Sequence, residues 1–292
     1  MATNSGLTHQ QIAHFQRDGY LALRGLLPQE DLQPLIDELA ARVEIGIDEA
    51  IAAGVLAAED VYEGASFAQR LGLVSAACAE SGWIWERYFR QQKIRSAGMF
   101  VLRTSEALLD AVGSLIGSEI YAHPQFNLRA KMPEQEVTVI PWHQDLAYLN
   151  PEEAGETLVV NAWIPLVAAT LDNGCMQVIR GSHRLGLLAH NYKDETPGHT
   201  GGRGIREEEL PAGDVFSAEL DVGDVLLTTE RLVHRGTPNR SQTVRWSVDT
   251  RYSQLGLPTG RESVPGFVAR SRQDPASVVR DHQEWNRIFA AV

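Results

Sequence analysis

His143 and Asp145 are separated by one residue and follow a β-rich segment, residues 137–142. On an extended strand the side chains of residues i and i+2 point to the same face, so this imidazole and this carboxylate can reach one metal ion. His234 follows a second strand-like segment, which we expect to begin at Asp224 and to continue to Val233. Two histidines and one carboxylate form the facial triad that suits non-haem Fe(II) and leaves coordination positions open. We therefore predict that His143, Asp145 and His234 are the metal ligands and the catalytic centre.

Arg245 lies in the next predicted strand, residues 244–248. We expect this strand to run back antiparallel and to aim the guanidinium into the floor of a barrel, below the metal. A buried guanidinium requires a carboxylate partner, which its planar fork can bind through two hydrogen bonds. No acidic residue nearby in the sequence is an obvious partner, so the carboxylate of a ligand is an attractive one.

The composition restricts the class of partner. The 292-residue chain has a net charge of -12 at pH 7, which argues against nucleic acid or an anionic membrane as the main partner. Cys78 and Cys175 are the only cysteines, so no disulfide framework is expected and a reduced, cytoplasmic setting is the default. Neither a signal peptide nor a membrane span is expected. A small-molecule substrate is the predicted partner, with the protein a monomer or a homodimer.

The first part of the chain, residues 1–118, is predicted to be mainly helical. Thr8 and Gln11 form a capping-box pattern that begins a helix over 11–18, which Gly19 ends before a short strand at 20–23. Further helices are expected after Pro28, through most of 48–95, and over 105–116. The helix after Pro28 has apolar residues at helical spacing: Leu32, Leu35, Ile36, Leu39 and Val43.

The pattern changes near residue 119, and short β-branched or aromatic segments alternate with turns until about residue 255. Such spacing predicts a barrel or jelly roll. Asn173-Gly174 lies between segments 163–166 and 176–179 and predicts a hairpin. The glycine-rich segment at about 190–210 is interpreted as a mobile lid or as a disordered surface insertion. The tail, residues 256–292, is irregular with a short helix expected over 283–290, and the whole chain, 1–292, is predicted to be one domain.

Several motifs occur in a fixed order along the chain. They are Phe15-Gln16-Arg17-Asp18-Gly19-Tyr20, His143-Gln144-Asp145-Leu146-Ala147-Tyr148, Ala162-Trp163, Asn173-Gly174-Cys175, Arg180-Gly181-Ser182-His183, Gly223-Asp224, and His234 with Arg245. In these motifs the chain resembles the phytanoyl-CoA dioxygenase family of Fe(II)/2-oxoglutarate-dependent oxygenases, from about Leu7 to Tyr252. The resemblance implies an α+β fold: a double-stranded β-helix, a jelly-roll or cupin-like barrel, with the N-terminal helices packed on one face.

The resemblance also implies roles for particular residues. The triad would bind Fe(II), and Arg245 would bind the distal carboxylate of 2-oxoglutarate, with O2 as the second co-substrate. Trp163 and Asn127 match positions that line the co-substrate site. The family often carries a hydroxyl two residues after the second metal histidine. That position is Gly236 here, so Thr237 supplies the hydroxyl or it is absent.

The reaction implied by the resemblance is hydroxylation of a small molecule with release of succinate and CO2. Relatives that halogenate carry a small residue in place of the carboxylate, so Asp145 disfavours halogenation. Desaturation, epoxidation or cyclisation with the same cofactors remains open, as do a zinc hydrolase that uses the same triad and a non-catalytic barrel. We expect substrate specificity in residues 48–103, 125–129 and 190–210, and the substrate itself stays open.

The remaining candidates are weighed as structural or functional residues. His183, His190 and His199 are not expected to be metal ligands. His183 is expected to tie a loop by hydrogen bonds, His123 is expected to be structural, and Trp142 is expected to pack in the core. Tyr148 lines the substrate pocket or packs elsewhere. The aromatic residues at 83–89 belong to the core or cap the site. Arg129 and Lys131 bind an anionic substrate or lie on a solvated face.

Overall fold

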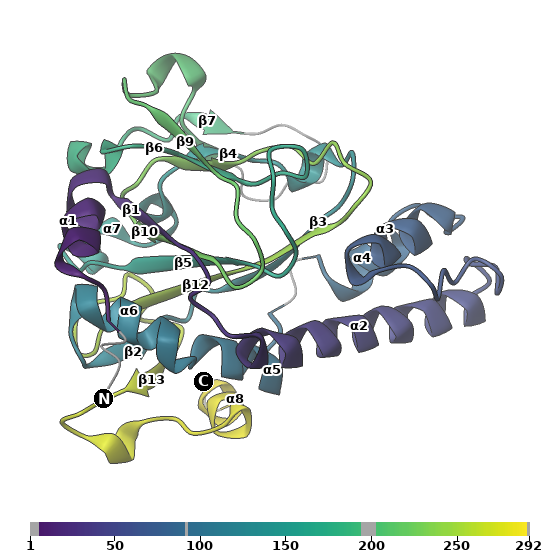
Figure 1. Ribbon diagram of the computed structural model, residues 1–292, viewed down its shortest axis with the longest axis horizontal. Coiled ribbons are helices and arrows are strands. Elements are labelled where there is room, and N and C mark those ends of the chain that lie inside the picture. The colour runs from purple at the N-terminus through teal and green to yellow at the C-terminus, as the bar shows by residue number, and fades with distance from the viewer. Residues whose placement is uncertain (1–5, 91–92, 194–202, 291–292) are drawn as a thin grey trace.

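The computed structural model describes residues 6–90, 93–193 and 203–290 of the chain. Two antiparallel sheets lie face to face, and helices from the first part of the chain cover the outer face of the larger sheet (Figure 1). This arrangement confirms the predicted α+β fold, with a double-stranded β-helix and N-terminal helices on one face. None of the described helices is both long and apolar enough to cross a membrane.

The first helix begins where its capping residues predict. The backbone N–H of Gln11 donates to the Thr8 hydroxyl at 3.2 Å, and the Gln11 side chain accepts from the Thr8 N–H at 2.8 Å. This capping box begins α1 (His9–Asp18), which Gly19 ends in the left-handed conformation, with φ of 80°. A Cβ atom at Gly19 would overlap the ring of His183, so glycine also permits the close approach of that loop. The strand β1 (Tyr20–Leu23) follows directly, as predicted.

The helical layer is built around one long helix, α2 (Gln29–Ala52), which buries Leu32, Leu35, Leu39 and Val43 as the spacing predicts. The other helices are α3 (Phe67–Ala77), α4 (Trp83–Tyr88), α5 (Ala97–Arg103), α6 (Glu106–Ile116), α7 (Pro151–Ala154) and α8 (His282–Ala290). The 3-10 turns are η1 (Glu136–Thr138), η2 (Asp145–Tyr148), η3 (Ser182–Leu185), η4 (Glu207–Glu209) and η5 (Pro275–Ser277). The helices expected over 105–116 and 283–290 are therefore confirmed, whereas α5 was not predicted.

Within the described part of the chain, the larger sheet has seven strands. Six of them lie in the order β1, β10 (Val225–Thr229), β5 (Val160–Pro165), β12 (Arg245–Gln254), β2 (Ile120–Ala122) and β13 (Phe267–Arg270), and β3 (Asn127–Lys131) also pairs with β12. Two of these strands, β1 and β13, come from outside residues 119–255. The interval that the sequence assigns to the barrel is therefore too narrow.

The smaller sheet has the strand order β4 (Ile140–His143), β11 (His234–Gly236), β6 (Met176–Ile179) and β9 (Val215–Ala218). A separate two-stranded ribbon pairs β7 (Tyr192–Lys193) with β8 (Arg203–Gly204). From β4 onward the chain crosses repeatedly between the two main sheets, which brings distant segments together. The predicted lid at 190–210 lies partly outside the described residues, which omit 194–202, and it stays a prediction.

The predicted hairpin at Asn173-Gly174 is wrong. The turn itself forms, because the Asn173 side chain accepts from the Thr170 N–H at 2.8 Å and donates to the Ala168 carbonyl at 2.7 Å, while Gly174 has φ of 93°. The strands on either side, β5 and β6, belong to different sheets. Local turn chemistry reverses the chain but does not decide which strands then pair.

The predicted strand from Asp224 to Val233 is also interrupted. The strand β10 ends at Thr229 in the larger sheet, a turn follows, and β11 begins at His234 in the smaller sheet. Similarly, β12 does not pair with β11, as a simple antiparallel return would require, but lies in the larger sheet beside β5, β3 and β2.

Alternation along β12 separates the core from the cavity between the sheets. Trp246, Val248 and Tyr252 pack into the main hydrophobic core with the helices. The intervening residues Arg245 and Arg251 line the cavity on the other face. One strand therefore supplies both the packing that fixes the sheet and the charged groups of the site.

Candidate metal centre and its cavity

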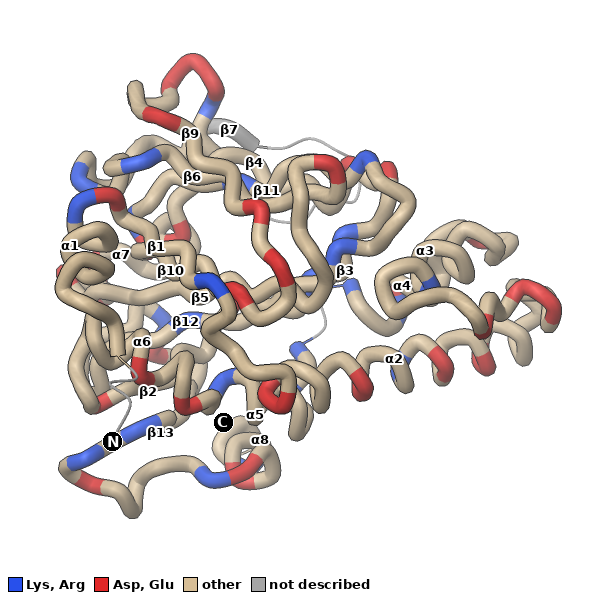
Figure 2. Tube along the Cα trace, viewed as in Figure 1, with Lys and Arg blue, Asp and Glu red and all other residues tan. Residues whose placement is uncertain are grey.

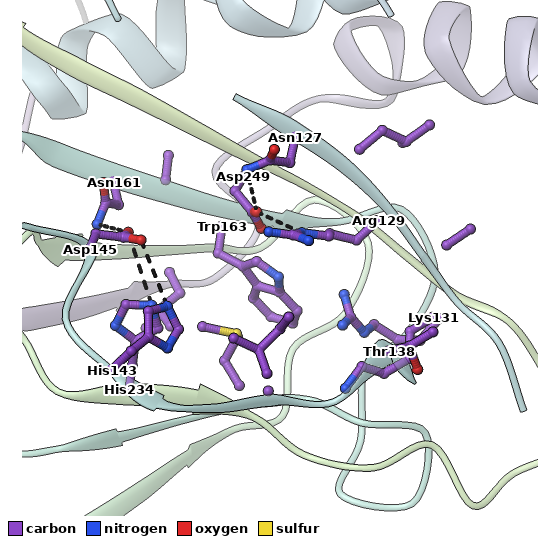
Figure 3. Close-up of a pocket in the computed structure, with 18 of the residues that line it drawn as sticks. Asn127, Arg129, Lys131, Thr138, His143, Asp145, Asn161, Trp163, His234 and Asp249 are labelled. Atoms are coloured by element: carbon purple, nitrogen blue, oxygen red, sulfur yellow. Dashed lines mark hydrogen bonds and ion pairs between the residues drawn. The ribbon is translucent and has the colours of Figure 1, made fainter. Parts of the chain in front are cut away.

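His143, Asp145 and His234 lie together at one end of the cavity between the sheets (Figure 3). His143 ends β4, Asp145 begins η2, and His234 lies opposite His143 in the register of β4 and β11. The Nε2 atom of His143 lies 3.8 Å from one carboxylate oxygen of Asp145, and that of His234 lies 4.0 Å from the other. All three ligand atoms lie within 4.8 Å of one another, so one ion could contact all three.

Both imidazoles are oriented by backbone carbonyls. Nδ1 of His143 lies 2.8 Å from the Pro141 oxygen, and Nδ1 of His234 lies 2.9 Å from the Leu232 oxygen. A proton on Nδ1 makes each of these contacts a hydrogen bond and leaves the Nε2 lone pair free for a metal. Burial, together with the neighbouring His234, lowers the pKa of His143 to about 3, so this ring is neutral at physiological pH.

The carboxylate of Asp145 has a protein donor on each oxygen. Arg251 donates to one oxygen at 2.8 Å, and the Asn161 amide donates to the other at 2.7 Å. Burial alone would favour the protonated acid, but Arg251 and the two histidines hold the pKa of Asp145 well below its usual range. Arg251 and Asn161 lie opposite each other on β12 and β5, so two neighbouring strands of the larger sheet fix one ligand.

Gln144, between the two ligands, turns away from the cavity and is fully buried. Its amide donates to the carbonyls of Gly186 at 2.7 Å and Arg231 at 2.6 Å, and its oxygen accepts from the Leu188 N–H at 2.8 Å. His190 accepts the backbone N–H of Gln144 at 3.0 Å, so this ring has a structural contact beside the metal ligands. These bonds connect the first ligand segment to the turn that leads into His234.

The donor set fits a divalent metal. Two buried imidazoles and an ionised carboxylate approach from one side, and the rest of the coordination sphere faces a cavity of about 460 Å³. Zinc also accepts these ligand types, so the triad alone does not decide between Fe(II) and Zn(II). The other residues of the cavity must distinguish them.

Arg245 and Trp163 also line this cavity. The Arg245 guanidinium donates to the Gly174 carbonyl at 3.2 Å and to the Ser247 hydroxyl, and its central carbon lies 5.4 Å from the centroid of the Trp163 ring. The indole N–H of Trp163 donates to the same Ser247 hydroxyl at 3.2 Å. Arg245 is 3% exposed and forms no ion pair with any carboxylate among the described residues. A buried cation without a carboxylate partner indicates an anionic ligand.

Of the other two residues predicted for the co-substrate site, Asn127 lies in the cavity and Thr237 does not. Asn127 lines the cavity, where its amide donates to Asp249 at 3.3 Å beside the Arg129–Asp249 ion pair of 3.1 Å (Figure 3). Thr237 is buried outside the lining, and its hydroxyl donates to the Cys175 carbonyl at 2.9 Å. The hydroxyl of Thr237 is therefore engaged by the backbone in this structure.

Two cations of β3 were expected either to bind an anionic substrate or to lie on a solvated face. Arg129, with 43% of its side chain exposed, lies at the edge of the cavity in its ion pair with Asp249. Lys131 is only 3% exposed, so a solvated position is wrong for this residue. Figure 2 shows acidic residues repeated along α2, whereas basic residues occur on β3.

The remaining candidates are mostly structural. His123 is buried between Thr259 and Gln125, His183 contacts the Gln16 carbonyl at 3.1 Å, and His199 lies outside the described residues. Trp142 packs with Ile179, Ile205 and Val233, as expected. Tyr148 does not line the cavity but meets the His143 ring edge-on, with centroids 5.4 Å apart. Among the aromatic residues at 83–89, Trp85 and Phe89 line the cavity as well as packing in the core.

Arg251, Asn161 and the role of Gln144 were not predicted from the sequence. The signal for Arg251 was present, because Arg245, Ser247, Asp249 and Arg251 alternate with core residues along one strand and must share a face. Asn161 could not be found in this way, since its neighbour across the sheet depends on which strands pair.

A family model described as "Phytanoyl-CoA dioxygenase (PhyH)" matches residues 15–247. The chain is 34% identical over 119 residues to 1-deoxypentalenic acid 11-beta-hydroxylase of Streptomyces arenae, covering 38% of this chain and 40% of the hydroxylase. It is 25% identical over 258 residues to the peroxisomal phytanoyl-CoA dioxygenase of Homo sapiens, covering 86% of this chain and 69% of that protein. The match to the hydroxylase thus spans less than half of its length.

Among solved structures, EctD from S. alaskensis with 2-oxoglutarate and 5-hydroxyectoine superposes with a TM-score of 0.55. The identity is 19%, and the match covers 95% of this chain and 89% of EctD. At this identity the likeness supports the fold, and the residues of the cavity must support the chemistry.

Proposed function

Because the chain belongs to the phytanoyl-CoA dioxygenase family, we propose that it is an Fe(II)- and 2-oxoglutarate-dependent dioxygenase that hydroxylates a small molecule. The products from the co-substrate are succinate and CO2. The EctD structure, which contains 2-oxoglutarate, has the same fold and supports this choice of co-substrate. We propose that His143, Asp145 and His234 bind the iron and that Arg245, Trp163 and Asn127 line the 2-oxoglutarate site.

One observation carries the proposal: the cavity that contains the triad also contains a buried guanidinium with no carboxylate partner among the described residues. A hydrolytic zinc site requires the triad and a water molecule but has no use for Arg245. A dicarboxylate could chelate the metal at one end and bind the guanidinium at the other. Such a ligand would give both the triad and Arg245 a function. The zinc hydrolase therefore explains less of the site.

The residues of the chain prepare this site in two ways. The Pro141 and Leu232 carbonyls hold both imidazoles with Nε2 toward the metal position. Arg251 and Asn161 hold Asp145 ionised and in one orientation. When bound there, iron would supply activation of O2 coupled to oxidative decarboxylation of 2-oxoglutarate.

The carboxylate at position 145 argues against halogenation. A halogenase of this family has a small residue there, and the vacated coordination position accepts chloride. Here both oxygens of Asp145 are bound by Arg251 and Asn161, so the side chain is fixed toward the metal position. Oxygen insertion or hydrogen abstraction is therefore the proposed outcome.

The substrate is proposed to be a small molecule, because the cavity of about 460 Å³ lies in the usual range for such ligands. The matched hydroxylase is named for a carboxylic acid, 1-deoxypentalenic acid, which supports testing acids first. Cys78 and Cys175 are both free and buried, which supports the cytoplasm as the compartment.

The test is succinate formation. Protein loaded with Fe(II) is incubated with O2, 2-oxoglutarate and a panel of metabolites, and succinate and product mass are measured. We expect substrate-dependent succinate and a gain of one oxygen in the product, both lost in His143→Ala. Loss of two hydrogens would instead indicate desaturation or cyclisation. Activity with Zn(II) and no 2-oxoglutarate would overturn the proposal in favour of a hydrolase.

A further inference from the structure

Gly236 leaves a space on the wall of the cavity that faces the metal site. It lies two residues after His234 on β11, so a side chain at 236 would point to the same face as that ligand. A Cβ atom added to Gly236 would lie 3.4 Å from Nζ of Lys131, with Ile140 the next neighbour at 3.8 Å. The ammonium of Lys131 therefore lies next to the space that a side chain at 236 would fill.

The neighbouring residue does not supply a polar group to this space. The Thr237 hydroxyl donates to the Cys175 carbonyl at 2.9 Å, and the Thr237 carbonyl accepts a hydrogen bond from the Lys131 ammonium. Apart from the chain neighbours of Gly236, Lys131 thus supplies the polar atom nearest to the space that a side chain would fill.

Lys131 and Arg245 form a pair of buried cations. They lie opposite each other in the register of β3 and β12, and both contact the Gly174 turn. Each is 3% exposed, and neither forms an ion pair with a carboxylate among the described residues. Burial and the nearby Arg245 lower the pKa of Lys131 far below its ordinary value. Two adjacent buried cations are costly unless an anion binds between them.

Both residues also line the cavity that holds the triad. We propose that Lys131 binds the distal carboxylate of 2-oxoglutarate together with Arg245, in the place of the side chain that Gly236 lacks. This inference rests on the proposed function, since it assigns a second residue to the co-substrate site. It makes Lys131 a determinant of co-substrate choice, because its ammonium contributes only when the keto acid carries a second carboxylate.

The test measures binding without turnover. Protein loaded with Co(II) under anaerobic conditions is titrated calorimetrically with 2-oxoglutarate and with 2-oxopentanoate, which has the same chain length but no distal carboxylate. Lys131→Met keeps most of the side-chain volume and removes the charge. We expect it to raise the Kd for 2-oxoglutarate about ten- to hundredfold, as for loss of a hydrogen bond to a charged group. The Kd for 2-oxopentanoate should stay the same.

Arg129→Met is the matched control, because it removes another cation from the same strand and the same cavity while leaving Lys131 and Arg245 in place. It should change the Kd for 2-oxoglutarate much less than Lys131→Met does. An equal effect of the two variants would mean that only the total charge of the cavity matters, and the inference would fail. It would also fail if Lys131→Met weakened both keto acids equally, since that result indicates a structural role.

A comparison of Lys131→Ala with Lys131→Ala/Gly236→Ser independently tests whether the ammonium of Lys131 occupies the space beside Gly236. In Lys131→Ala/Gly236→Ser, the new hydroxyl enters the space beside the missing ammonium. It should recover about threefold to tenfold of the 2-oxoglutarate affinity lost in Lys131→Ala, as for one neutral hydrogen bond. No recovery counts against the shared position. If the unmodified protein binds neither keto acid, the proposed function itself fails, whereas tight binding that Lys131→Met leaves intact overturns only the role of Lys131.

Discussion

The guanidinium of Arg251 lies 2.8 Å from a carboxylate oxygen of Asp145, and both side chains are buried. Arg251 lies on β12 of the larger sheet, whereas Asp145 follows β4 of the smaller sheet, so this ion pair connects the two sheets. It keeps the aspartate ionised before any metal arrives, and it restricts the direction from which the carboxylate can approach an ion.

Arg251→Met should weaken metal binding about 10- to 100-fold, because removal of a group that orients a ligand typically has this effect. Competition between the protein and a chromophoric chelator for Co(II) measures the affinity. Arg235→Met is the control, because Arg235 lies on β11 next to His234 but stacks on Trp142 outside the cavity. Equal affinities of Arg251→Met and the unmodified protein would show that Arg251 does not position the ligand.

The ion pair between Arg251 and Asp145 should also contribute to the free energy of unfolding. In metal-free protein, Asp145→Ala or Arg251→Met alone should each lower the free energy of unfolding by about 3–5 kcal/mol, because one buried charge is left without its partner. The double variant should cost clearly less than the sum of the two. Urea unfolding of the four proteins measures this coupling, and additive costs would contradict a direct interaction.

Arg245→Met should separate stability from co-substrate binding. It removes a buried cation that lacks a carboxylate partner among the described residues, so the metal-free protein should be at least as stable as before. The rise in Tm that 2-oxoglutarate causes in metal-loaded protein should disappear. The rise caused by metal alone should remain, since the triad is intact, and this serves as the internal control. A retained response to 2-oxoglutarate would refute the role of Arg245.

His123 should contribute to the pH dependence of stability. Its ring is fully buried, with Nε2 2.9 Å from the Thr259 carbonyl and Nδ1 accepting from the Gln125 N–H at 3.1 Å. Burial lowers the pKa of His123 from 6.5 to about 4. The unfolded chain therefore binds more protons between these values, and the contribution of about 3 kcal/mol is present above pH 6.5 and is lost as the pH falls toward 4.

Urea unfolding of metal-free protein at pH 7 and at pH 4.5 tests this expectation. His123→Gln should lose less stability between the two pH values than the unmodified protein does. His9→Gln, which alters an exposed histidine, should behave like the unmodified protein. An unchanged pH dependence in His123→Gln would show that burial does not favour the neutral ring in the folded state.

The triad and its arginine could be predicted because they depend on local geometry. One residue between His143 and Asp145 places both on one face of an extended segment, and Gln144 is extended in the structure. The alternation along β12 fixes the face of Arg245 in the same way. Helix starts were equally local, as the capping box at Thr8 shows.

What could not be predicted depends on strand pairing. The sequence around Asn173-Gly174 predicts a reversal, but the choice between pairing in one sheet and crossing to the other depends on packing across the sandwich. The positions of Asn161 beside Asp145 and of Lys131 beside Gly236 depend on the same choice. These residues lie far apart in the sequence and meet only when both sheets are complete.

The two sheets divide the site between them. The triad lies on or directly after strands of the smaller sheet, whereas Arg245 and Lys131 lie on the larger one. Under the proposed function, 2-oxoglutarate would contact groups from both sheets and would act as a removable cross-link between the layers. Binding and turnover of the co-substrate would then make and break that link, so the rigidity of the sandwich would change during the catalytic cycle.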